Sequence, residues 1–277
     1  MPLKTLIRFL QWQLGSKILI GSAVVPFIGG TRLLVKKGMT GATGNIYCGL
    51  HDFQDMAFLM HMLKPDDLFV DVGANIGSYT ILAGGVCGAS VLSIEPIRST
   101  YECLLDNLYL NRLNNLVIAK NIGIGSNSGS AMFSESLGPG NRIIEKGGAE
   151  LENRVSLESL DVLLRGLSPT LIKIDVEGYE TEVINGASNT MMANGLLAVI
   201  MELQGLGSDF GFDEDNLHAK MLNHGFKPYE YKPFERKLVE LKNKDDKSSN
   251  TLYIRDIDAV KRRVDCAPTC TWNGVQF

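Results

Sequence analysis

The stretch "LFVDVGANIGSYTI", residues 68–81, decides the fold. An apolar run ends in the carboxylate of Asp71 and then passes through Gly73 and Gly77 into a segment with helical spacing. A buried strand, a glycine turn and a helix in this order are typical of sheets that bind a ligand at the carboxyl ends of their strands. The stretch therefore predicts an α/β fold and a ligand at this turn.

The rest of the chain continues this alternation of short apolar runs and longer amphipathic runs. The apolar runs predict strands at residues 68–72, 91–95, 116–122, 171–175 and 197–203. The amphipathic runs predict helices at residues 78–87, 98–111, 156–165, 179–188 and 213–224. Alternation of this kind predicts a mostly parallel sheet with helices on both faces. We expect a loop or loose hairpin over the ligand edge at residues 123–150, and a solvated hairpin turn before the last strand at residues 235–250.

Composition and charge narrow the class of protein. The chain has 277 residues, of which 45% are apolar, and its net charge is −4, so it is globular and lacks the basic excess of a nucleic-acid-binding protein. Its five cysteines are scattered and have no metal-binding spacing, which predicts free thiols, no metal site and a reducing, cytoplasmic compartment. They are Cys48, Cys87, Cys103, Cys266 and Cys270.

The N-terminal segment differs from the rest. Residues 3–14 have the spacing of an amphipathic helix, and the apolar run at residues 18–30 is too short to span a bilayer. We divide the chain into an N-terminal helical extension or cap, residues 1–64, and a ligand-binding domain, residues 65–277. The N-terminal helix has several open roles: it could cap the main domain, pair with a second copy in a homodimer, contact a membrane surface or belong to a secretory signal.

Polar side chains close several of the apolar runs. The carboxyl ends of parallel strands meet at one edge of a sheet, so these side chains predict a binding edge. They are Asp71, Glu95, Asn121, Asp175 and Glu202.

The glycine turn favours one of two ligand classes. A dinucleotide needs a second close glycine beside its pyrophosphate, where this chain has Asn75, and Asp71 would repel a phosphate. S-adenosylmethionine carries an ammonium and a sulfonium, which a carboxylate favours. Glu95 stands 24 residues after Asp71 and suits two ribose hydroxyls, although NAD-binding domains place an acid similarly. Asn121 and Ile122 would then flank the adenine. Two alternatives stay open. The protein could be an NAD-dependent oxidoreductase, or Asp71 and Glu95 could only cap helices or lie at the surface.

The motifs resemble a known family. "FVDVGANIGSYT", "SIEP" followed by "LLDNLYLN", "NIGIGSNSG", "VSLESLD" and "LIKIDVEGYETEVINGA" occur in the order and spacing of FkbM-type methyltransferases over residues 45–205. The resemblance implies a Rossmann-like class I methyltransferase fold and S-adenosylmethionine as cofactor, with S-adenosylhomocysteine as product. Asn121 and Ser126 stand in a loop where the family often has an acidic residue. The cofactor-binding positions that it implies are Asp71, Gly73, Ala74, Asn75, Gly77 and Glu95, beside Asn121 and Ile122.

The segment "KIDVEG" supplies the candidate catalytic residues. Methyl transfer to a hydroxyl needs alignment and a base. Lys173 and Asp175 share one face of a strand, and Glu177 follows at the loop beyond it, so Asp175 or Glu177 is expected to face the substrate. In the alternative, Lys173 and Asp175 form a structural ion pair and Glu177 caps a helix. His51 is a further candidate base, or a packing or surface residue.

The expected acceptor is an oxygen. The chain has no Asn-Pro-Pro-Tyr or Asp-Pro-Pro-Tyr segment after the fourth strand, as methylation of base amino groups would want, and no cysteine at that edge. The family resemblance implies a hydroxyl of a sugar, a polyketide or a similar small molecule or glycan. A cofactor-binding protein without turnover is the remaining alternative.

Overall fold

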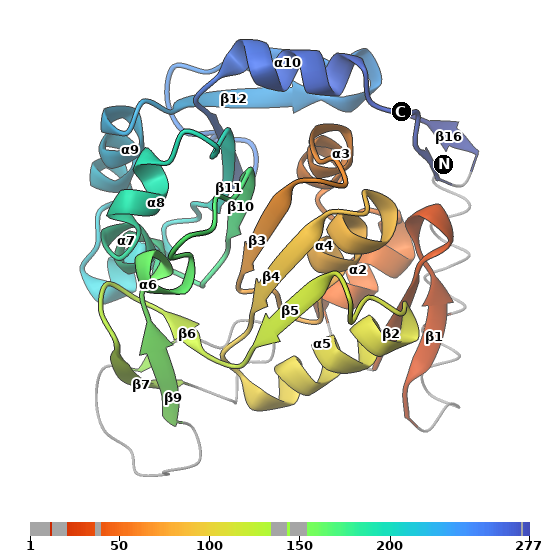
Figure 1. Cartoon of the computed structure of the whole chain (residues 1–277), viewed down its shortest axis with the longest axis horizontal. Helices are drawn as coiled ribbons and strands as arrows, with labels where there is room; N and C mark the ends of the chain where they lie inside the picture. Colours follow the sequence, from red (N-terminus) through yellow and green to blue (C-terminus); the bar gives the residue numbers. More distant parts are fainter. Residues whose placement is uncertain (1–11, 13–20, 37–39, 134–142, 145–153, 273) are drawn as a thin grey trace.

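A single large sheet forms the centre of the molecule. The computed structural model describes residues 12, 21–36, 40–133, 143–144, 154–272 and 274–277. Within them, eight strands pair side by side (Figure 1). Their order is β13 (Lys237–Glu240), β12 (Lys227–Lys232), β14 (Asn250–Ile254), β11 (Ala198–Glu202), β10 (Leu171–Ile174), β3 (Leu68–Val72), β4 (Ser90–Ile94) and β5 (Val117–Lys120).

The middle of this sheet is parallel. Strands β11, β10, β3, β4 and β5 pair in parallel, whereas β14 runs antiparallel to β11, β12 to β14, and β13 to β12. All five predicted strands are confirmed with small changes at their ends, and so is the mostly parallel α/β class. Residues 235–250, predicted as a solvated hairpin turn, include β13, which extends the sheet at one edge.

Helices cover both faces because successive side chains of a buried strand point to opposite sides. One face packs Phe69 and Val91 against α3 (Phe53–Met62), α4 (Ser78–Ile81), α5 (Arg98–Leu110) and α10 (Ile257–Asp265). A π-type turn, Leu82–Val86, extends α4. The other face packs Val70 and Leu92 in a core with α6 (Leu160–Leu163), α7 (Glu180–Asn185), α8 (Ser188–Met192) and α9 (Glu214–Asn223). Figure 1 shows the two helical layers on opposite sides of the sheet.

A small hairpin extends the first helical layer. Strands β1 (Ala23–Pro26) and β2 (Arg32–Val35) pair across the 3-10 turn Ile28–Gly30, and α2 (Thr40–Cys48) follows. The side chains of Asn107 on α5 and of Asn111, directly after α5, accept from the main chain of β2 at 2.7 and 2.8 Å. The predicted helix at residues 3–14 lies outside the described residues except Trp12, which packs against the core of this face.

A second sheet stands beside β5, where the sequence predicts a loop or loose hairpin. Its order is β6 (Gly123–Ile124), β9 (Arg154–Glu158), β7 (Gly129–Phe133) and β8 (Ile143–Ile144). The helix predicted over residues 156–165 is therefore wrong in its first residues, because the chain is still extended in β9. Ser159 then begins α6 by accepting from the main-chain N–H of Val162.

The remaining elements are short. Two 3-10 turns, Leu206–Phe210 and Pro233–Glu235, follow β11 and β12, and the strands β15 (Thr271–Trp272) and β16 (Val275–Gln276) pair near the C-terminus. All five cysteines are free thiols, as predicted. Among the described residues, no helix has the length and apolar character needed to cross a membrane.

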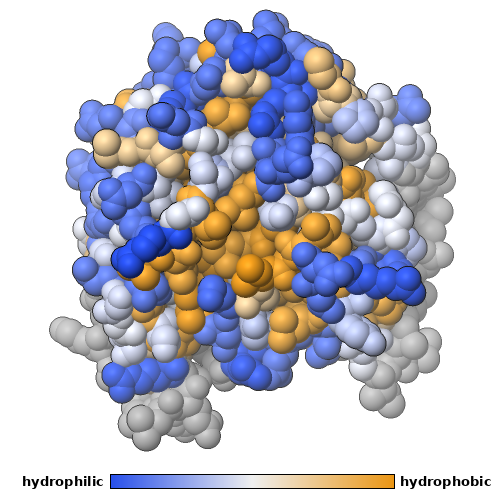
Figure 2. Space-filling model, viewed as in Figure 1, coloured by the Kyte–Doolittle hydropathy of each residue, from blue (hydrophilic) through white to orange (hydrophobic). Residues whose placement is uncertain are grey.

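Apolar side chains gather on part of the surface. Figure 2 shows them in the middle of the face that Figure 1 presents. Ile118 on the edge strand β5 is 65% exposed, and Leu116 beside it is 37% exposed. Exposed apolar groups along an unpaired strand edge are typical of surfaces that contact other proteins.

Candidate active site

A cavity of about 420 Å³ opens at the carboxyl ends of the parallel strands. Cavities of this size hold small ligands. Four of the five side chains predicted to form a binding edge line it: Asp71, Glu95, Asp175 and Glu202. They come from or directly follow β3, β4, β10 and β11, so the parallel sheet brings together residues that are far apart in the chain.

The glycine turn forms one half of the cavity. We call this the glycine-turn half, and it comprises residues 71–76 with Glu95, Ile97, Ile122 and Phe133. The described lining does not include Gly77, which follows at the start of α4. Gly73 has φ +80°, and a Cβ at this position would overlap the main-chain oxygen of Asp175. Gly77 has φ +91°, and a Cβ there would press on Leu104 of α5. The two glycines allow the turn to pass close to β10 on one side and to α5 on the other.

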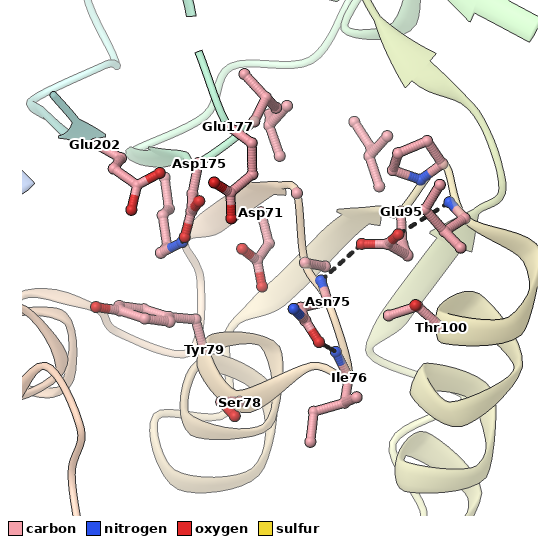
Figure 3. A pocket seen from close by; sticks show the side chains of 18 of the residues that line it. Asp71, Asn75, Ile76, Ser78, Tyr79, Glu95, Thr100, Asp175, Glu177 and Glu202 are labelled. Atoms are coloured by element: carbon pink, nitrogen blue, oxygen red, sulfur yellow. Dashed lines mark hydrogen bonds and ion pairs between the residues drawn. The ribbon is translucent and has the colours of Figure 1, made fainter. Parts of the chain in front are cut away.

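The carboxylate of Glu95 is held in a fixed orientation. Its Oε2 accepts from the main-chain N–H of Asn75 and its Oε1 from that of Ile97, both at 2.9 Å (Figure 3). Burial raises the pKa of Glu95 to about 7, although the two main-chain donors act to lower it. Each oxygen keeps lone-pair capacity for a further donor. The carboxylate can therefore accept further donors from a ligand, and its contact with ribose hydroxyls stays a prediction.

Asp71 is almost fully buried and only partly satisfied. Its Oδ2 accepts from the hydroxyl of Thr80 at 2.7 Å, whereas Oδ1 has no hydrogen-bond partner among the described residues. Burial raises the pKa of Asp71, and Lys173 acts to lower it. A buried carboxylate oxygen without a donor is uncommon in folded proteins. Since Asp71 lines the cavity, a ligand with an N–H donor or a positive charge fits this position.

The predicted adenine contacts divide into two kinds. Ile122 lines the cavity, beside Ile97 and Phe133, which the sequence analysis missed. The described cavity lining does not include Asn121, whose amide donates to the main-chain oxygens of Glu95 and Pro96 at 2.9 and 2.8 Å. Asn121 therefore positions the loop that carries Glu95.

Ser126, singled out as a departure from the family pattern, also lies away from this lining. Its hydroxyl donates to Glu182 at 2.5 Å. In the described structure it belongs to the packing of α7 and not to the cavity wall.

A second half of the cavity is rich in acids. We call it the carboxylate half, and it comprises Asp52, Tyr79, Lys173, Asp175, Glu177, Glu202, Gln204 and Asn250, with His51 at its rim. Lys173 is 4% exposed at its side chain and meets Asp175 at 2.7 Å, with its ammonium 4.7 Å from the centre of the Tyr79 ring. The predicted ion pair between Lys173 and Asp175 is therefore present. The side chain of Asp175 is still 31% exposed, toward the cavity.

The charges of this half depend on one another. Burial acts to raise the pKa of Asp175, but Lys173 beside it holds that pKa below its ordinary value. Burial and the charge of Asp175 raise the pKa of Glu202 to about 9. Burial acts to lower the pKa of Lys173, but Asp175 and Asp71 hold it above its ordinary value. At neutral pH, Asp175 is therefore ionised, Lys173 is charged and Glu202 carries a proton.

Glu177 faces the cavity from the turn after β10. Its φ is +54°, in the left-handed region, and its carboxylate points toward those of Asp175 and Glu202 (Figure 3). One oxygen from each of these three residues lies within 4.8 Å of the others. The alternative in which Glu177 caps the following helix is wrong. Glu180 takes that place, because its Oε1 accepts from the main chain of Val176 and Gly178 at 3.2 Å.

The N-terminal part of the chain supplies one wall. Tyr79 donates its hydroxyl to Asp52 at 3.1 Å, and His51 is exposed at the rim, with its main-chain N–H bonded to Asn45 at 2.9 Å. The sequence analysis named His51 but missed Asp52, Tyr79, Gln204 and Asn250. The polar ending of the apolar run 197–203 pointed to Glu202 as an edge residue. No comparable signal marked the others.

This arrangement fits one class of ligand better than another. The described lining has six carboxylate side chains and one lysine, with no arginine. A pyrophosphate would meet these acids without a free cation to balance it, whereas a ligand with an ammonium and a sulfonium would be attracted. The cavity residues therefore fit S-adenosylmethionine better than they fit a dinucleotide.

Comparison with known proteins agrees with this chemistry. A model described as "Methyltransferase FkbM domain" matches residues 71–228. Hexuronic acid methyltransferase AglP of Haloferax volcanii is 29% identical over 137 residues, which cover 49% of this chain and 56% of that protein. Methyltransferase sdnD of Sordaria araneosa is 28% identical over 170 residues, covering 48% of this chain and 65% of that protein. The chain thus spans less than two thirds of the length of these curated relatives.

Solved structures resemble the fold at low sequence identity. A precorrin-6Y C5,15-methyltransferase from Geobacter metallireducens aligns with a TM-score of 0.41 and 14% identity, over 74% of this chain and 87% of that one.

Proposed function

The chain belongs to the FkbM methyltransferase family, and from this membership we propose that it transfers a methyl group from S-adenosylmethionine to a hydroxyl oxygen of a sugar, a polyketide or a similar small molecule or glycan. S-adenosylmethionine is the cofactor of this family and supplies a methyl group activated by a positively charged sulfur. The acceptor and the oxygen specificity are the parts of the proposal that go beyond the family.

One observation carries the proposal: acids from four strands meet at one cavity, and a buried oxygen of Asp71 has no donor within the described part of the chain. A cationic methyl donor supplies both the charge and the donor that this site needs. Asp71, Gly73, Ala74, Asn75, Gly77 and Glu95 would hold that donor, with Ile122 beside the adenine and Asn121 behind the loop of Glu95.

The carboxylate half would hold the acceptor. Asp175 is ionised and reaches the cavity, so it can take the proton of a hydroxyl as the new carbon–oxygen bond forms. Lys173 keeps Asp175 charged and in place, and Glu177 lies beside it as the second candidate base. His51, exposed at the rim, would contact the outer part of the acceptor.

The two alternatives from the sequence are weaker. An NAD-dependent oxidoreductase would need a pyrophosphate beside Asp71 and Glu177, which acids repel. A protein that binds the cofactor without turnover would have no reason to direct several carboxylates at the space next to it.

The proposal also assigns a role to each of the two predicted parts of the chain. Residues 1–64 would complete the acceptor pocket, since Asn45, His51, Asp52 and Met56 line the cavity, while residues 65–277 would bind the cofactor. The relative named for hexuronic acid supports a sugar as acceptor. A cytoplasmic location, the absence of nucleic-acid substrates, membrane contact through the N-terminal helix and a homodimer stay predictions.

Turnover tests the proposal. The chain is incubated with methyl-labelled S-adenosylmethionine and a panel of sugars, polyketides and amines, and products are identified by mass spectrometry and by the position of the label. We expect label on a hydroxyl oxygen. Label on nitrogen only, or none on any acceptor, would overturn the oxygen assignment. A titration followed by NADH fluorescence tests the oxidoreductase, for which we expect no saturable binding.

A further inference from the structure

The carboxylate half has an unusual balance of hydrogen-bond donors and acceptors. Four of its side chains, Tyr79, Asn250, Gln204 and Lys173, each direct a donor at a carboxylate. Tyr79 donates to Asp52 at 3.1 Å, Asn250 donates to Asp55 at 3.0 Å, and Gln204 donates to Glu202. The carboxylate oxygens of Asp175, Glu177 and Glu202 stand nearby within 4.8 Å of one another. This half thus presents mainly acceptors to whatever enters it.

The positive charge in this half is already engaged. Lys173 is the one lysine among the described lining residues, and its ammonium lies between Asp175 and the ring of Tyr79. Its side chain is 4% exposed, so little of this ammonium is open to a ligand. The surroundings already resist further negative charge, as the raised pKa of Glu202 indicates.

From this balance we infer that the acceptor is uncharged and rich in hydroxyl donors, a neutral sugar, and that the carboxylate half excludes acceptors carrying a carboxylate. The inference rests on the proposed function and narrows its substrate class. Hydroxyls donate to the carboxylates of Asp175 and Glu177, whereas a carboxylate placed within several ångströms of them would meet like charge, and among the described lining residues Lys173 is already paired with Asp175.

Matched pairs of sugars test this selectivity. Methyl glucoside and methyl glucuronoside differ only in a hydroxymethyl group against a carboxylate, and galactose and mannose give equivalent pairs. Binding to the protein loaded with S-adenosylhomocysteine is measured by ligand-observed NMR, with a chelator present. Turnover is measured in parallel with S-adenosylmethionine. We expect at least one neutral member to bind about tenfold or more tightly than its acid.

Charge variants assign the effect to these residues. Glu177→Gln is expected to raise the ratio of acid to neutral binding by about tenfold, because it removes a negative charge that faces the cavity. Glu240→Gln removes an exposed acid outside the cavity lining and should leave the ratio unchanged.

The outcomes separate the two proposals. Equal or tighter binding of the acids, binding of an acid only with added Mg²⁺, or no binding in any pair would overturn the inference. The first two results, with methyl transfer to the acid's hydroxyls, would leave the proposed function standing. Failure to bind S-adenosylhomocysteine would overturn the proposed function itself.

Discussion

The two halves of the cavity are built in different ways. The glycine-turn half draws most of its polar groups from one strand–turn–helix unit and the strand that follows, so its geometry is largely a property of the local chain. The carboxylate half draws on residues from His51 to Asn250, which only the complete sheet brings together. The proposed cofactor site therefore depends mostly on one short segment. The proposed acceptor site depends on residues from many elements.

The largest effect is expected in the carboxylate half. Asp175→Asn removes the charge that takes the hydroxyl proton and should lower kcat by about 100-fold to 10,000-fold. The affinity for S-adenosylhomocysteine should change by less than about threefold, because the glycine-turn half is intact. Steady-state kinetics and calorimetry measure the two quantities.

The equivalent change at Glu177 is the matched comparison. If Glu177→Gln lowers kcat as strongly and Asp175→Asn does not, Glu177 is the base. If both variants lose cofactor affinity as much as kcat, the separation of the two halves is wrong. A thermal melt checks that Asp175→Asn, which leaves the buried ammonium of Lys173 beside a neutral amide, has not unfolded the protein.

The next largest effect is expected at Gly73, where the glycine turn contacts the end of β10. Gly73→Ala places a Cβ against the main-chain oxygen of Asp175 and strains a residue at φ +80°. We expect the affinity for S-adenosylhomocysteine to fall by about 100-fold, or about 2.7 kcal/mol, as the turn moves away from β10. Isothermal calorimetry measures it.

A glycine with free space provides the control for this prediction. Gly129→Ala has no atom within 4 Å of the new Cβ and an ordinary φ, so binding should stay as in the unaltered chain. Equal affinities for the two variants would show that the contact between the turn and β10 is not needed.

A smaller effect is expected at Glu95. Glu95→Ala should weaken the binding of S-adenosylhomocysteine by about 10-fold to 30-fold, or about 1.4 to 2 kcal/mol in total, since it removes the carboxylate that accepts from the ribose hydroxyls. Maximal turnover at saturating cofactor should change little. Glu102→Ala, an exposed acid on α5 paired with Arg98, is the control that should bind normally. An unchanged affinity in Glu95→Ala would remove the ribose assignment.

The smallest effect is a dependence on pH. Burial raises the pKa of Glu95 to about 7, and hydroxyl donors favour its ionised form. The affinity for S-adenosylhomocysteine should therefore rise with pH through this range, by at most about tenfold per pH unit, and level off above it. The same carboxyl stabilises the fold below its ordinary pKa of 4.5 and loses that contribution as pH rises through about 7.

The pH prediction needs a variant because other groups titrate nearby. Burial also raises the pKa of Asp55 and Glu180 to about 7. In Glu95→Gln the pH dependence of binding should flatten. A curve as steep as that of the unaltered chain would assign the dependence to another group.

Sequence predicted the glycine-turn half well because its signals are local. Each of its main features can be explained without reference to distant residues. These features are the run 68–72, the glycines at 73 and 77 and the acid at 95. Asn121 shows the limit. It ends the predicted strand at the correct edge, yet its amide faces the main chain of Glu95 and Pro96. Position along a strand predicts the edge, and only packing decides where the side chain turns.

The carboxylate half was predicted only in part, because its residues come from segments that are far apart in the sequence. The spacing of Lys173 and Asp175 indicates their contact, but nothing near Asp52 or Asn250 in the sequence points to a cavity formed with residues more than 100 positions away. The second sheet was missed because residues 123–133 and 154–158 pair through β7 and β9 across a long connection. Pairing over such a distance leaves no local pattern.

Calorimetric titration with S-adenosylhomocysteine tests most directly whether acids at this sheet edge bind a cationic methyl donor's product. The account predicts one site per chain with a dissociation constant below about 100 μM, no measurable binding of NADH, and weaker binding in Glu95→Ala. No binding of S-adenosylhomocysteine at about 1 mM, or saturable binding of NADH in its place, would contradict it.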